Sequence, residues 1–534
     1  MKKPSHLLLL LIFLVVHNAS ALEIRGTVYE DANANGSRDV DEPGLAGIQV
    51  SNGHRIVRTD SQGRYVIDID DRRGHVMVLK PAQFALPRNA FGLPEYYWLH
   101  YPAGSPARAY AGIAPTGPVP ASVDFALIPS DAPDALRLLA IADPQTSNTR
   151  QLAFFERRFT DELRGLEDID LALVLGDLLN DRLDLAEPFD RVVANFGHPW
   201  VPVIGNHDLD LDADSDFGAA DSFTGRYGPA TWAFAEGPAH FLVLDDIRFY
   251  MPPSGQYGYH GGFRAEQLDF VQRYLADVPR DAPLVVAMHI PLSSDDFRAQ
   301  DRERLLALLA PFETVLLLAG HTHTNHHAYL DRSRGWPSDE GHAHEYVVGT
   351  ASGGWWGGKL ADDGLPHAIM RDGTPPGYAI ITLDNDSYAI DYRAVGQPGT
   401  QMALFGPGSI MADTYPNAYV YANVFNGDRH TQVELQLERL DSRARSAVVE
   451  PWAAMRKVNE PDPRALQLML ERMQLDGEPD NSRMSPPRDS SHLWRTRLST
   501  DIEPGQYRVR VRARDRWGMD ATEHTDFRVY PRGG

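Results

Sequence analysis

Several short apolar runs in the middle of the chain end in residue types that commonly ligate metal ions. The runs cover residues 138–142, 171–175, 201–204, 284–288 and 315–319. Ligand sites in α/β sheets collect at the carboxyl ends of the strands, so we expect the residues after these runs to meet in one crevice. These residues are Asp143 with Gln145, Asp177, Asn206 with His207 and Asp208, His289, and His321 with His323.

The donor types of this set indicate which ions it could hold. Hard oxygen ligands mixed with imidazole suit Mn, Fe or Zn, and a shared carboxylate suits a pair of metal ions. Glycines stand directly before Asp177, Asn206 and His321, where they let the backbone turn sharply and approach the site. Cysteine is absent from the chain, which excludes thiolate metal sites, thiol catalysis and disulfides. The set therefore predicts metal-dependent hydrolytic chemistry.

The elements that position these residues alternate as in an α/β layered domain, which we place at residues 131–397. Between the apolar runs, Leu152, Phe155, Phe159 and Leu163 recur at helical spacing. Before this domain, residues 22–130 show short alternating segments separated by turn residues, which predicts an all-β module. After it, residues 398–534 return to a mainly-β pattern. We therefore expect a multidomain fold, with a central α/β sandwich of helix-flanked sheets between two mainly-β domains.

The order of the motifs resembles that of the calcineurin-like metallophosphoesterases. That superfamily shows D-x-H, G-D-x-x-[DN], G-N-H-[DE], a lone His and G-H-x-H, and four of these five blocks are intact between residues 143 and 323. Residues 347–357 and 372–378 are similar to those of an exported three-domain subgroup. That subgroup has an N-terminal module of the B-repeat or transthyretin-like type and a C-terminal β-domain. The resemblance covers nearly the whole chain after residue 21.

The resemblance implies two divalent metal ions and a division of labour around them. Asp177 would bridge the ions, and a hydroxide between them would attack phosphorus in line. His207 would stabilise the developing charge and help to protonate the leaving oxygen, and Asp208 would orient His207 by a hydrogen bond. Asn180 and Asp181 stay open between a structural role and support of the ligands. Metal one would be held by Asp143, Gln145, Asp177 and His323, and metal two by Asp177, Asn206, His289 and His321.

Gln145 departs from the superfamily pattern, which usually has His at this position. An amide oxygen is a weaker donor to a transition metal than imidazole, so metal one should bind less tightly and prefer a harder ion such as Mn. Manganese-dependent ADP-ribose and CDP-alcohol diphosphatases resemble this chain in having Gln there. The competing hypothesis is that metal one is vacant and the enzyme is impaired.

A loop near the N-terminus matches the calcium pattern D-x-[DN]-x-[DN]-G-x5-E. Side-chain oxygens at alternate positions would point inward, and a final Glu would close the site. The loop predicts one structural calcium ion, and the alternative is a solvated Asp/Asn turn. Its candidate ligands are Asp31, Asn33, Asn35, Asp39 and Glu42.

The first 21 residues are typical of a cleaved export signal. Lys2 and Lys3 precede an apolar run at residues 7–16, and small residues at 19–21 fit a cleavage site. The run is too short to span a bilayer, so we expect no transmembrane segment in the mature chain. We expect the protein to be exported, either periplasmic or secreted.

The net charge of the chain indicates which kinds of binding partner to expect. The formal net charge is -22, and an acidic surface repels phosphate backbones and anionic membranes. Long nucleic acids are therefore not expected, whereas a small phosphorylated substrate is. The main prediction is an exported phosphoesterase for phosphomonoester, phosphodiester or nucleotide-type pyrophosphate bonds. The alternative is a surface or carbohydrate-binding protein on a degenerate phosphoesterase scaffold.

Overall fold

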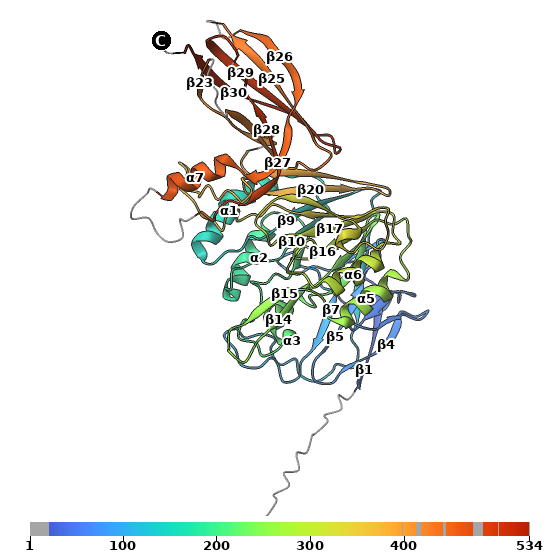
Figure 1. Cartoon of the computed structure of the whole chain (residues 1–534). Coiled ribbons are helices and arrows are strands. Elements are labelled where there is room, and N and C mark those ends of the chain that lie inside the picture. The colour runs from blue at the N-terminus through green and yellow to red at the C-terminus, as the bar shows by residue number, and fades with distance from the viewer. Residues whose placement is uncertain are drawn as a thin grey trace, which may run out of the picture.

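The computed structural model describes residues 21–397, 399–412, 418–441, 445–473, 484–499 and 501–532. The expected export signal lies outside the described residues except for Ala21, the first residue of β1. Figure 1 shows the N-terminal strands in blue at the bottom, the central sheets above them and the C-terminal strands at the top. The expected multidomain class, a sheet-rich core between two further domains, is confirmed.

The N-terminal region folds into two four-stranded sheets, ordered β4-β1-β8-β6 and β3-β2-β5-β7. Alternating side chains on β4 are buried, as expected for a strand with one face on a core. The bounds are β1 Ala21–Glu30, β2 Gln49–Ser51, β3 Ile56–Arg58, β4 Arg64–Asp70, β5 Gly74–Leu79, β6 Phe84–Ala85, β7 Tyr97–His100 and β8 Phe125–Pro129.

The central region contains a five-stranded sheet, β11-β10-β9-β20-β21, and a six-stranded sheet, β12-β13-β16-β17-β19-β18. Strands β9, β10 and β11 are parallel, and so are β13, β16, β17 and β19. The bounds are β9 Leu136–Ile141, β10 Leu171–Leu175, β11 Trp200–Val203, β12 Trp232–Glu236, β13 Ala239–Val243, β14 Ile247–Tyr250, β15 Gly258–Gly261, β16 Leu284–Ala287, β17 Val315–Ala319, β18 His326–Leu330, β19 Ala343–Val347, β20 Gly377–Leu383 and β21 Tyr388–Ala394.

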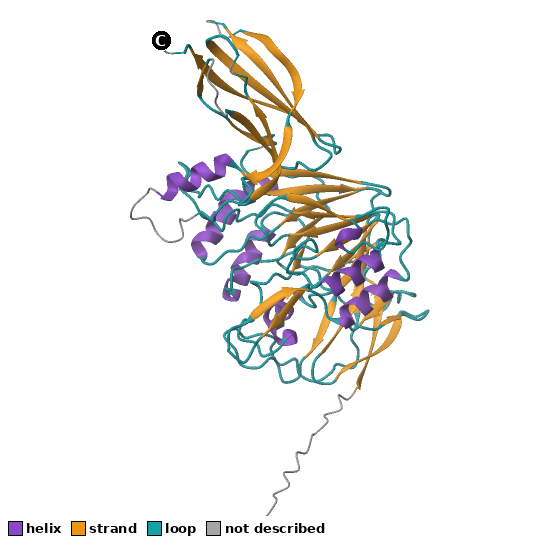
Figure 2. Ribbon diagram, viewed as in Figure 1, coloured by secondary structure: helices purple, strands orange, loops and turns teal. Residues whose placement is uncertain are grey.

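Helices cover the central sheets on two sides, with α1 and α2 on one side and α5 and α6 on the other (Figures 1 and 2). Helix α1 begins after Asn148, whose side chain accepts a hydrogen bond from the Gln151 amide at 3.0 Å. The apolar stripe expected from the sequence is its buried face. The bounds are α1 Thr149–Arg164, α2 Ala186–Ala194, α3 Asp216–Ala219, α4 Asp221–Tyr227, α5 Ala265–Leu275 and α6 Ala299–Leu309, with short 3-10 turns at Leu183–Leu185 and Arg332–Arg334.

The C-terminal region is a pair of sheets, ordered β22-β24-β28-β27 and β23-β30-β29-β25-β26, and has its own apolar core. By contrast, the N-terminal and central regions share one continuous core. The bounds are β22 Met402–Phe405, β23 Ser409–Met411, β24 Tyr419–Val424, β25 Gln432–Leu440, β26 Ser446–Ala454, β27 Arg456–Pro461, α7 Pro463–Met473, β28 Asp489–Arg497, β29 Gly505–Arg514 and β30 Asp520–Tyr530.

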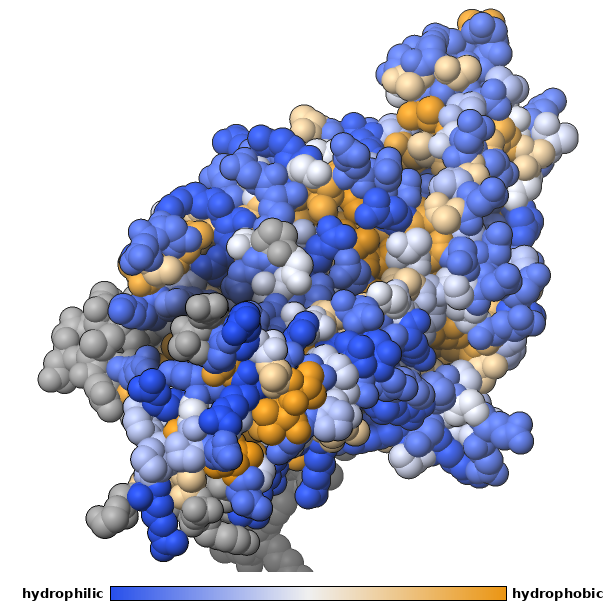
Figure 3. Space-filling view, turned by 90° about the horizontal axis from the view of Figure 1, so that it is seen from above, coloured by the Kyte–Doolittle hydropathy of each residue, from blue (hydrophilic) through white to orange (hydrophobic). Residues whose placement is uncertain are grey.

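The surface of the protein is mainly hydrophilic on the face seen from above (Figure 3). Figure 3 shows a face on which hydrophilic residues predominate, with smaller hydrophobic patches between them. Within the described ranges, no helix combines the length and the apolar character that crossing a bilayer requires.

A pair of hydrogen-bonded histidines, half-buried His327 and buried His344, joins the central sheet to the C-terminal region. The Tyr388 hydroxyl lies 2.7 Å from His344 Nδ1, and His344 Nε2 lies 3.0 Å from His327 Nδ1. His327 Nε2 in turn lies 3.1 Å from the side-chain oxygen of Asn426, next to β24. One tautomer of each ring satisfies all three bonds without a net charge. These histidines therefore serve a contact between regions and not the candidate metal cluster.

Acid should weaken this contact. Burial lowers the pKa of His327 to about 3 and holds the pKa of His344 well below its usual 6.5. In the unfolded chain these histidines take up protons near pH 6.5, whereas in the folded chain they stay neutral to a much lower pH. Their contribution to the free energy of unfolding is therefore fully present above pH 6.5 and is lost as the pH falls toward about 3. We expect the thermal midpoint to fall by about 5 °C between pH 7.5 and pH 5. The double variant His327→Gln, His344→Gln should lose less over the same range, and an equal loss would contradict the assignment.

Candidate functional site

The candidate metal ligands follow strands of both central sheets at their carboxyl ends. Asp143, Asp177 and Asn206 come shortly after the adjacent parallel strands β9, β10 and β11. His289 and His321 come after β16 and β17, which are adjacent in the other sheet. The structure brings the two groups together, because the ligand atoms of Asp177, His289 and His321 all lie within 4.8 Å of one another.

One half of the cluster surrounds the buried ring of His289. Its Nδ1–H donates to the Leu175 carbonyl at 2.9 Å, so Nε2 faces the cluster. Nε2 lies 3.1 Å from Asn206 Oδ1, 3.3 Å from Asp177 Oδ1 and 3.3 Å from His321 Nδ1. These four side chains are the expected ligands of metal two.

The other half contains Asp143, Gln145, Asp177 and His323. His323 Nδ1–H donates to the Gly353 carbonyl at 2.5 Å, and its Nε2 lies 3.6 Å from Asp143 Oδ1. The Gln145 amide nitrogen donates to Asp177 Oδ2 at 3.1 Å. Gln145 Oε1 is buried and has no hydrogen-bond partner among the described residues, which costs free energy that coordination to a cation would remove. The donor set therefore fits a second ion beside Asp177.

The loops that carry these ligands are held in uncommon backbone conformations. Asp143, Gln145, Asp177, His321 and His323 all have positive φ, between 42° and 72°. Left-handed conformations cost non-glycine residues about 1 kcal/mol or more each, and such strain gathers at functional sites. The tight turns point side chains that are close in sequence, such as His321 and His323, into the two halves of one cluster.

The charges of the cluster depend on one another. Burial opposes ionisation of Asp177, but His289 outweighs it and holds the pKa of Asp177 below its usual range. Burial opposes the charge of His289 as well, but Asp177 raises the pKa of His289 to about 10. These opposed shifts favour a proton shared by Asp177 and His289 when no cation is bound, and binding of a metal ion at such a site displaces protons.

His207 lies beside the cluster, and its partner differs from the expected one. Its Nδ1–H donates to Asp181 Oδ1 at 2.8 Å. The prediction that Asp208 orients this ring by a hydrogen bond is wrong, because the Asp208 carboxylate accepts from the amides of Leu178, Leu179 and Gly205 at 2.9–3.1 Å. Asp208 therefore ties together two ligand loops, and Asp181 orients His207.

The protonation of His207 follows from this environment. Burial lowers the pKa of His207, but the hydrogen bond that its ring donates to Asp181 and the charges of Asp177, Asp181 and Asp208 outweigh this effect and raise the pKa to about 9. The ring is 29% exposed, so a substrate could reach it. A protonated, accessible imidazole beside a metal site can donate a proton to a leaving group.

Two adjacent tryptophans near the cluster have different roles. Trp356 is buried, and its indole N–H donates to the Pro144 carbonyl at 2.9 Å, so it anchors the Asp143–Gln145 loop to the core. Trp355 is half-buried and stacks on the His323 ring, with ring centroids 3.7 Å apart. Trp356 therefore has the contacts of a core anchor, whereas Trp355 faces a ring of the candidate metal cluster.

The N-terminal calcium pattern folds into a loop whose side chains bind its own backbone. The Asp31 carboxylate accepts from the amides of Asn35 and Gly36 at 3.1 and 2.9 Å. The Glu42 carboxylate accepts from the amides of Ala32 and Asp39 at 3.1 and 3.0 Å. These bonds account for the loop conformation without an ion, and calcium binding stays a prediction.

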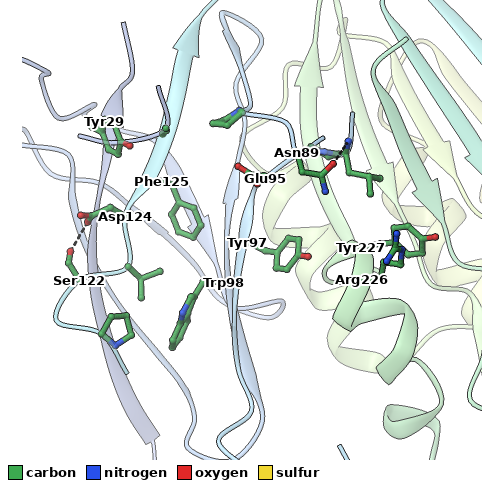
Figure 4. A pocket seen from close by; sticks show the side chains of 17 residues that line it. Tyr29, Asn89, Glu95, Tyr97, Trp98, Ser122, Asp124, Phe125, Arg226 and Tyr227 are labelled. Carbon is green, nitrogen blue, oxygen red and sulfur yellow. Dashed lines mark hydrogen bonds between the residues drawn. The ribbon is translucent and has the colours of Figure 1, made fainter. Parts of the chain in front are cut away.

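A separate cavity of about 470 Å³ lies between the N-terminal sheets and α4 (Figure 4). Tyr97, Trp98 and Asp124 line it together with Arg226. The Arg226 guanidinium donates to the buried Asp190 carboxylate, which also accepts from the Tyr227 hydroxyl at 2.8 Å. Arg226 and Tyr227 therefore stabilise the fold here.

Comparison with known proteins gives matches along most of the chain. The model for the calcineurin-like phosphoesterase matches residues 136–325. Models for the N terminal and the C terminal of the calcineurin-like phosphoesterase match residues 32–111 and 345–520.

Individual relatives are more distant. The 3',5'-cyclic adenosine monophosphate phosphodiesterases CpdA of Escherichia coli strains K12 and O157:H7 are each 31% identical over 166 residues, which is 29% of this chain and 55% of the relative. The chain thus spans about half the length of these curated relatives. A solved structure described as "Structure of PhoD" is 13% identical, with coverage of 76% of this chain and 90% of that one. Its TM-score is 0.36.

The three family models follow one another along the chain in the order N-terminal, core and C-terminal. The core model spans Asp143, Asp177, Asn206, His289 and His323, the residues that the two central sheets bring together. The chain belongs to the calcineurin-like phosphoesterase family.

Proposed function

We propose that the protein is a metal-dependent phosphoesterase that hydrolyses phosphomonoester, phosphodiester or nucleotide-type pyrophosphate bonds. The observation that carries this proposal is the convergence of the family's strand-end motifs on one buried cluster of carboxylate, amide and imidazole groups. The cAMP phosphodiesterase activity in the names of the relatives supports the phosphodiester member of this substrate class.

The donor set supports two divalent cations, with Asp177 shared between them. Asn206, His289 and His321 would complete one site, and Asp143, Gln145 and His323 the other. Mixed oxygen and imidazole donors suit Mn, Fe or Zn, and the amide oxygen of Gln145 favours Mn in its site. When bound, such a pair activates water as a nucleophile and neutralises charge on the phosphate.

The remaining side chains would manage protons and position. His207 would donate its proton to the departing oxygen, since it is charged and accessible. Asp181 would keep the proton on the ring and fix its orientation. Asp208 would hold the Asp177 and Asn206 loops in register through three backbone amides.

Positive charge beside the cluster supports an anionic substrate of small size. The Arg371 guanidinium lies 6.0 Å from the centroid of Trp355, the ring that stacks on His323. Burial and nearby Arg488 lower the pKa of Arg371. Two arginines in an acidic chain form a local contact for phosphate oxygens, whereas the overall charge disfavours long nucleic acids.

The remaining parts of the proposal concern organisation. We propose an export signal at residues 1–21, a β-module at 22–130 with the calcium loop, the phosphoesterase domain at 131–397 and a mainly-β domain at 398–534. The protein would act in the periplasm or after secretion. A carbohydrate-binding role on a degenerate scaffold is less well supported, because such a role gives no reason for buried ligand side chains to converge.

The test is hydrolysis of p-nitrophenyl phosphate and bis-p-nitrophenyl phosphate by the chain from Leu22 onward. The protein is first stripped of metal and then assayed with Mn, Zn, Fe or Ca. We expect turnover that requires metal, with Mn most effective because of Gln145. A folded protein that turns over neither these compounds nor a panel of nucleotides would contradict the proposal, and glycan binding by that protein would support the binding alternative.

A further inference from the structure

A residue of the N-terminal module reaches the pair formed by Asp181 and His207. Tyr110 belongs to the segment between β7 and β8, and its hydroxyl donates to the Asp181 carbonyl at 2.7 Å. Asp181 is bound to His207 twice, since its amide donates to the His207 carbonyl at 3.1 Å and its carboxylate accepts from the ring. A single residue thus links the module to the proposed proton donor.

The segment that carries Tyr110 is itself fixed to the central domain. Arg108 forms an ion pair with Asp221 at 3.0 Å, and the two side chains are 7% and 1% exposed. Arg108 also donates to the Gly218 carbonyl at 2.7 Å, and the Ala109 amide donates to Asp212 at 2.8 Å. Buried charge pairs with several hydrogen bonds fix geometry strongly. The position of Tyr110 is therefore set relative to the loop that follows His207.

Asp181 adopts a left-handed backbone conformation, which its bonds to Tyr110 and His207 hold in place. Its φ is 59°, in the left-handed region that costs an ordinary residue about 1 kcal/mol. Tyr110 also borders a cavity of about 460 Å³ whose other walls include Leu178, Leu179 and Asp208. Since a cavity supplies no packing contacts, the loop beside it depends more on directional bonds.

We propose that Tyr110 is a positioning residue for the phosphoesterase reaction, and that the N-terminal module thereby completes the active site. Its hydroxyl holds the carbonyl of Asp181, which keeps the Asp181 carboxylate on His207 Nδ1 and aims Nε2–H at the departing oxygen. The inference rests on the proposed function, because it concerns the proton that His207 would deliver. It makes the module a part of the enzyme and not a separate binding domain.

The test compares substrates that differ in their need for a proton donor. The leaving group of an alkyl phosphate is a strongly basic alkoxide, which needs a proton as it departs. The leaving group of a p-nitrophenyl ester is p-nitrophenolate, which departs without protonation. For Tyr110→Phe in the chain from Leu22 onward, we expect kcat with the alkyl phosphate to fall about 10-fold, with a smaller fall for the p-nitrophenyl ester and little change in KM. Asp181→Asn should show the same pattern with a larger effect.

Tyr65→Phe is the matched control, because the Tyr65 hydroxyl donates to the Val123 carbonyl at 2.6 Å within the same module. It should lower thermal stability without changing the ratio of the two rates. A merely structural role for Tyr110 predicts the Tyr65 result, or an equal loss with both leaving groups, and either outcome would overturn the proposal.

A second readout does not depend on turnover. The Nδ1–H proton of His207 should give a downfield resonance, assigned by its loss in His207→Ala. We expect Tyr110→Phe to shift or broaden this resonance, since the Asp181 carboxylate loses its fixed position. An unchanged resonance in Tyr110→Phe would contradict the positioning role, whether or not the wild-type protein hydrolyses a tested ester. Absence of hydrolysis by the wild-type protein would contradict only the proposed function.

Discussion

Replacing Asp177 by Asn should lower kcat/KM for bis-p-nitrophenyl phosphate by at least about 10³-fold, which corresponds to about 4 kcal/mol of transition-state stabilisation. Asp177 is the proposed shared ligand, and its carboxylate faces His289, Gln145 and the His207 amide at 2.9–3.3 Å. An amide in its place cannot bridge two cations as a carboxylate does. We expect the variant also to bind less than the wild-type amount of Mn, measured by metal analysis after dialysis.

The fold should tolerate this change, because Asn is nearly isosteric and accepts the positive φ of position 177. Asp184→Asn is the matched control for charge: it lies seven positions further on, is half exposed and pairs with Arg182 at 2.7 Å. That variant should retain full activity and metal content. Turnover by Asp177→Asn at the wild-type rate would contradict the proposal that Asp177 is shared between two cations.

Replacing His207 by Ala should lower kcat about 10²–10⁴-fold for an alkyl phosphate, the range expected for loss of a general acid. The loss should be smaller for a p-nitrophenyl ester, whose leaving group is stable as an anion. Metal content should not change, because His207 contacts the cluster through its backbone amide and not through a free ring nitrogen. Steady-state kinetics with the two leaving groups, together with metal analysis, measures both expectations.

His198→Ala provides the comparison for His207. His198 is a half-buried histidine of the same domain, and its Nε2 lies 2.8 Å from the Leu163 carbonyl. Its loss should affect stability and leave the ratio of rates for the two leaving groups unchanged. If His207→Ala lowers both rates equally, or releases metal, His207 acts as a ligand or a structural group and not as the proton donor.

Much of the fold follows from short-range patterns in the sequence. The helical spacing of Leu152, Phe155, Phe159 and Leu163 gives the buried face of α1, because a helix with one apolar stripe must bury that stripe. The apolar runs before Asp143, Asp177 and His321 are β9, β10 and β17, since short buried runs in an α/β pattern form parallel strands. The limits that we propose for the three domains remain predictions.

The hydrogen-bond partner of His207 could not be predicted from the sequence. Asp208 is its neighbour in sequence, yet consecutive side chains on a turn point in different directions, and Asp208 instead caps the amides of Leu178, Leu179 and Gly205. Asp181 is 26 positions away from His207, and the left-handed turn at Asp181 accompanies its approach to the ring. Spacing along a chain does not report the direction of a side chain on an irregular loop.

The sequence by itself indicated which residues could ligate metal ions and predicted that they would meet, because the carboxyl-end rule needs only the local pattern of apolar runs followed by ligand-type residues. The tertiary structure alone decided that Asp181 holds His207, that Trp355 stacks on His323, and that Tyr110 reaches the site from 71 positions away. Each of these contacts joins loops or domains whose relative placement is set by packing of the shared core and by buried ion pairs such as Arg108 with Asp221. Such contacts form only when the whole chain is folded, so no periodicity or motif in one segment contains them.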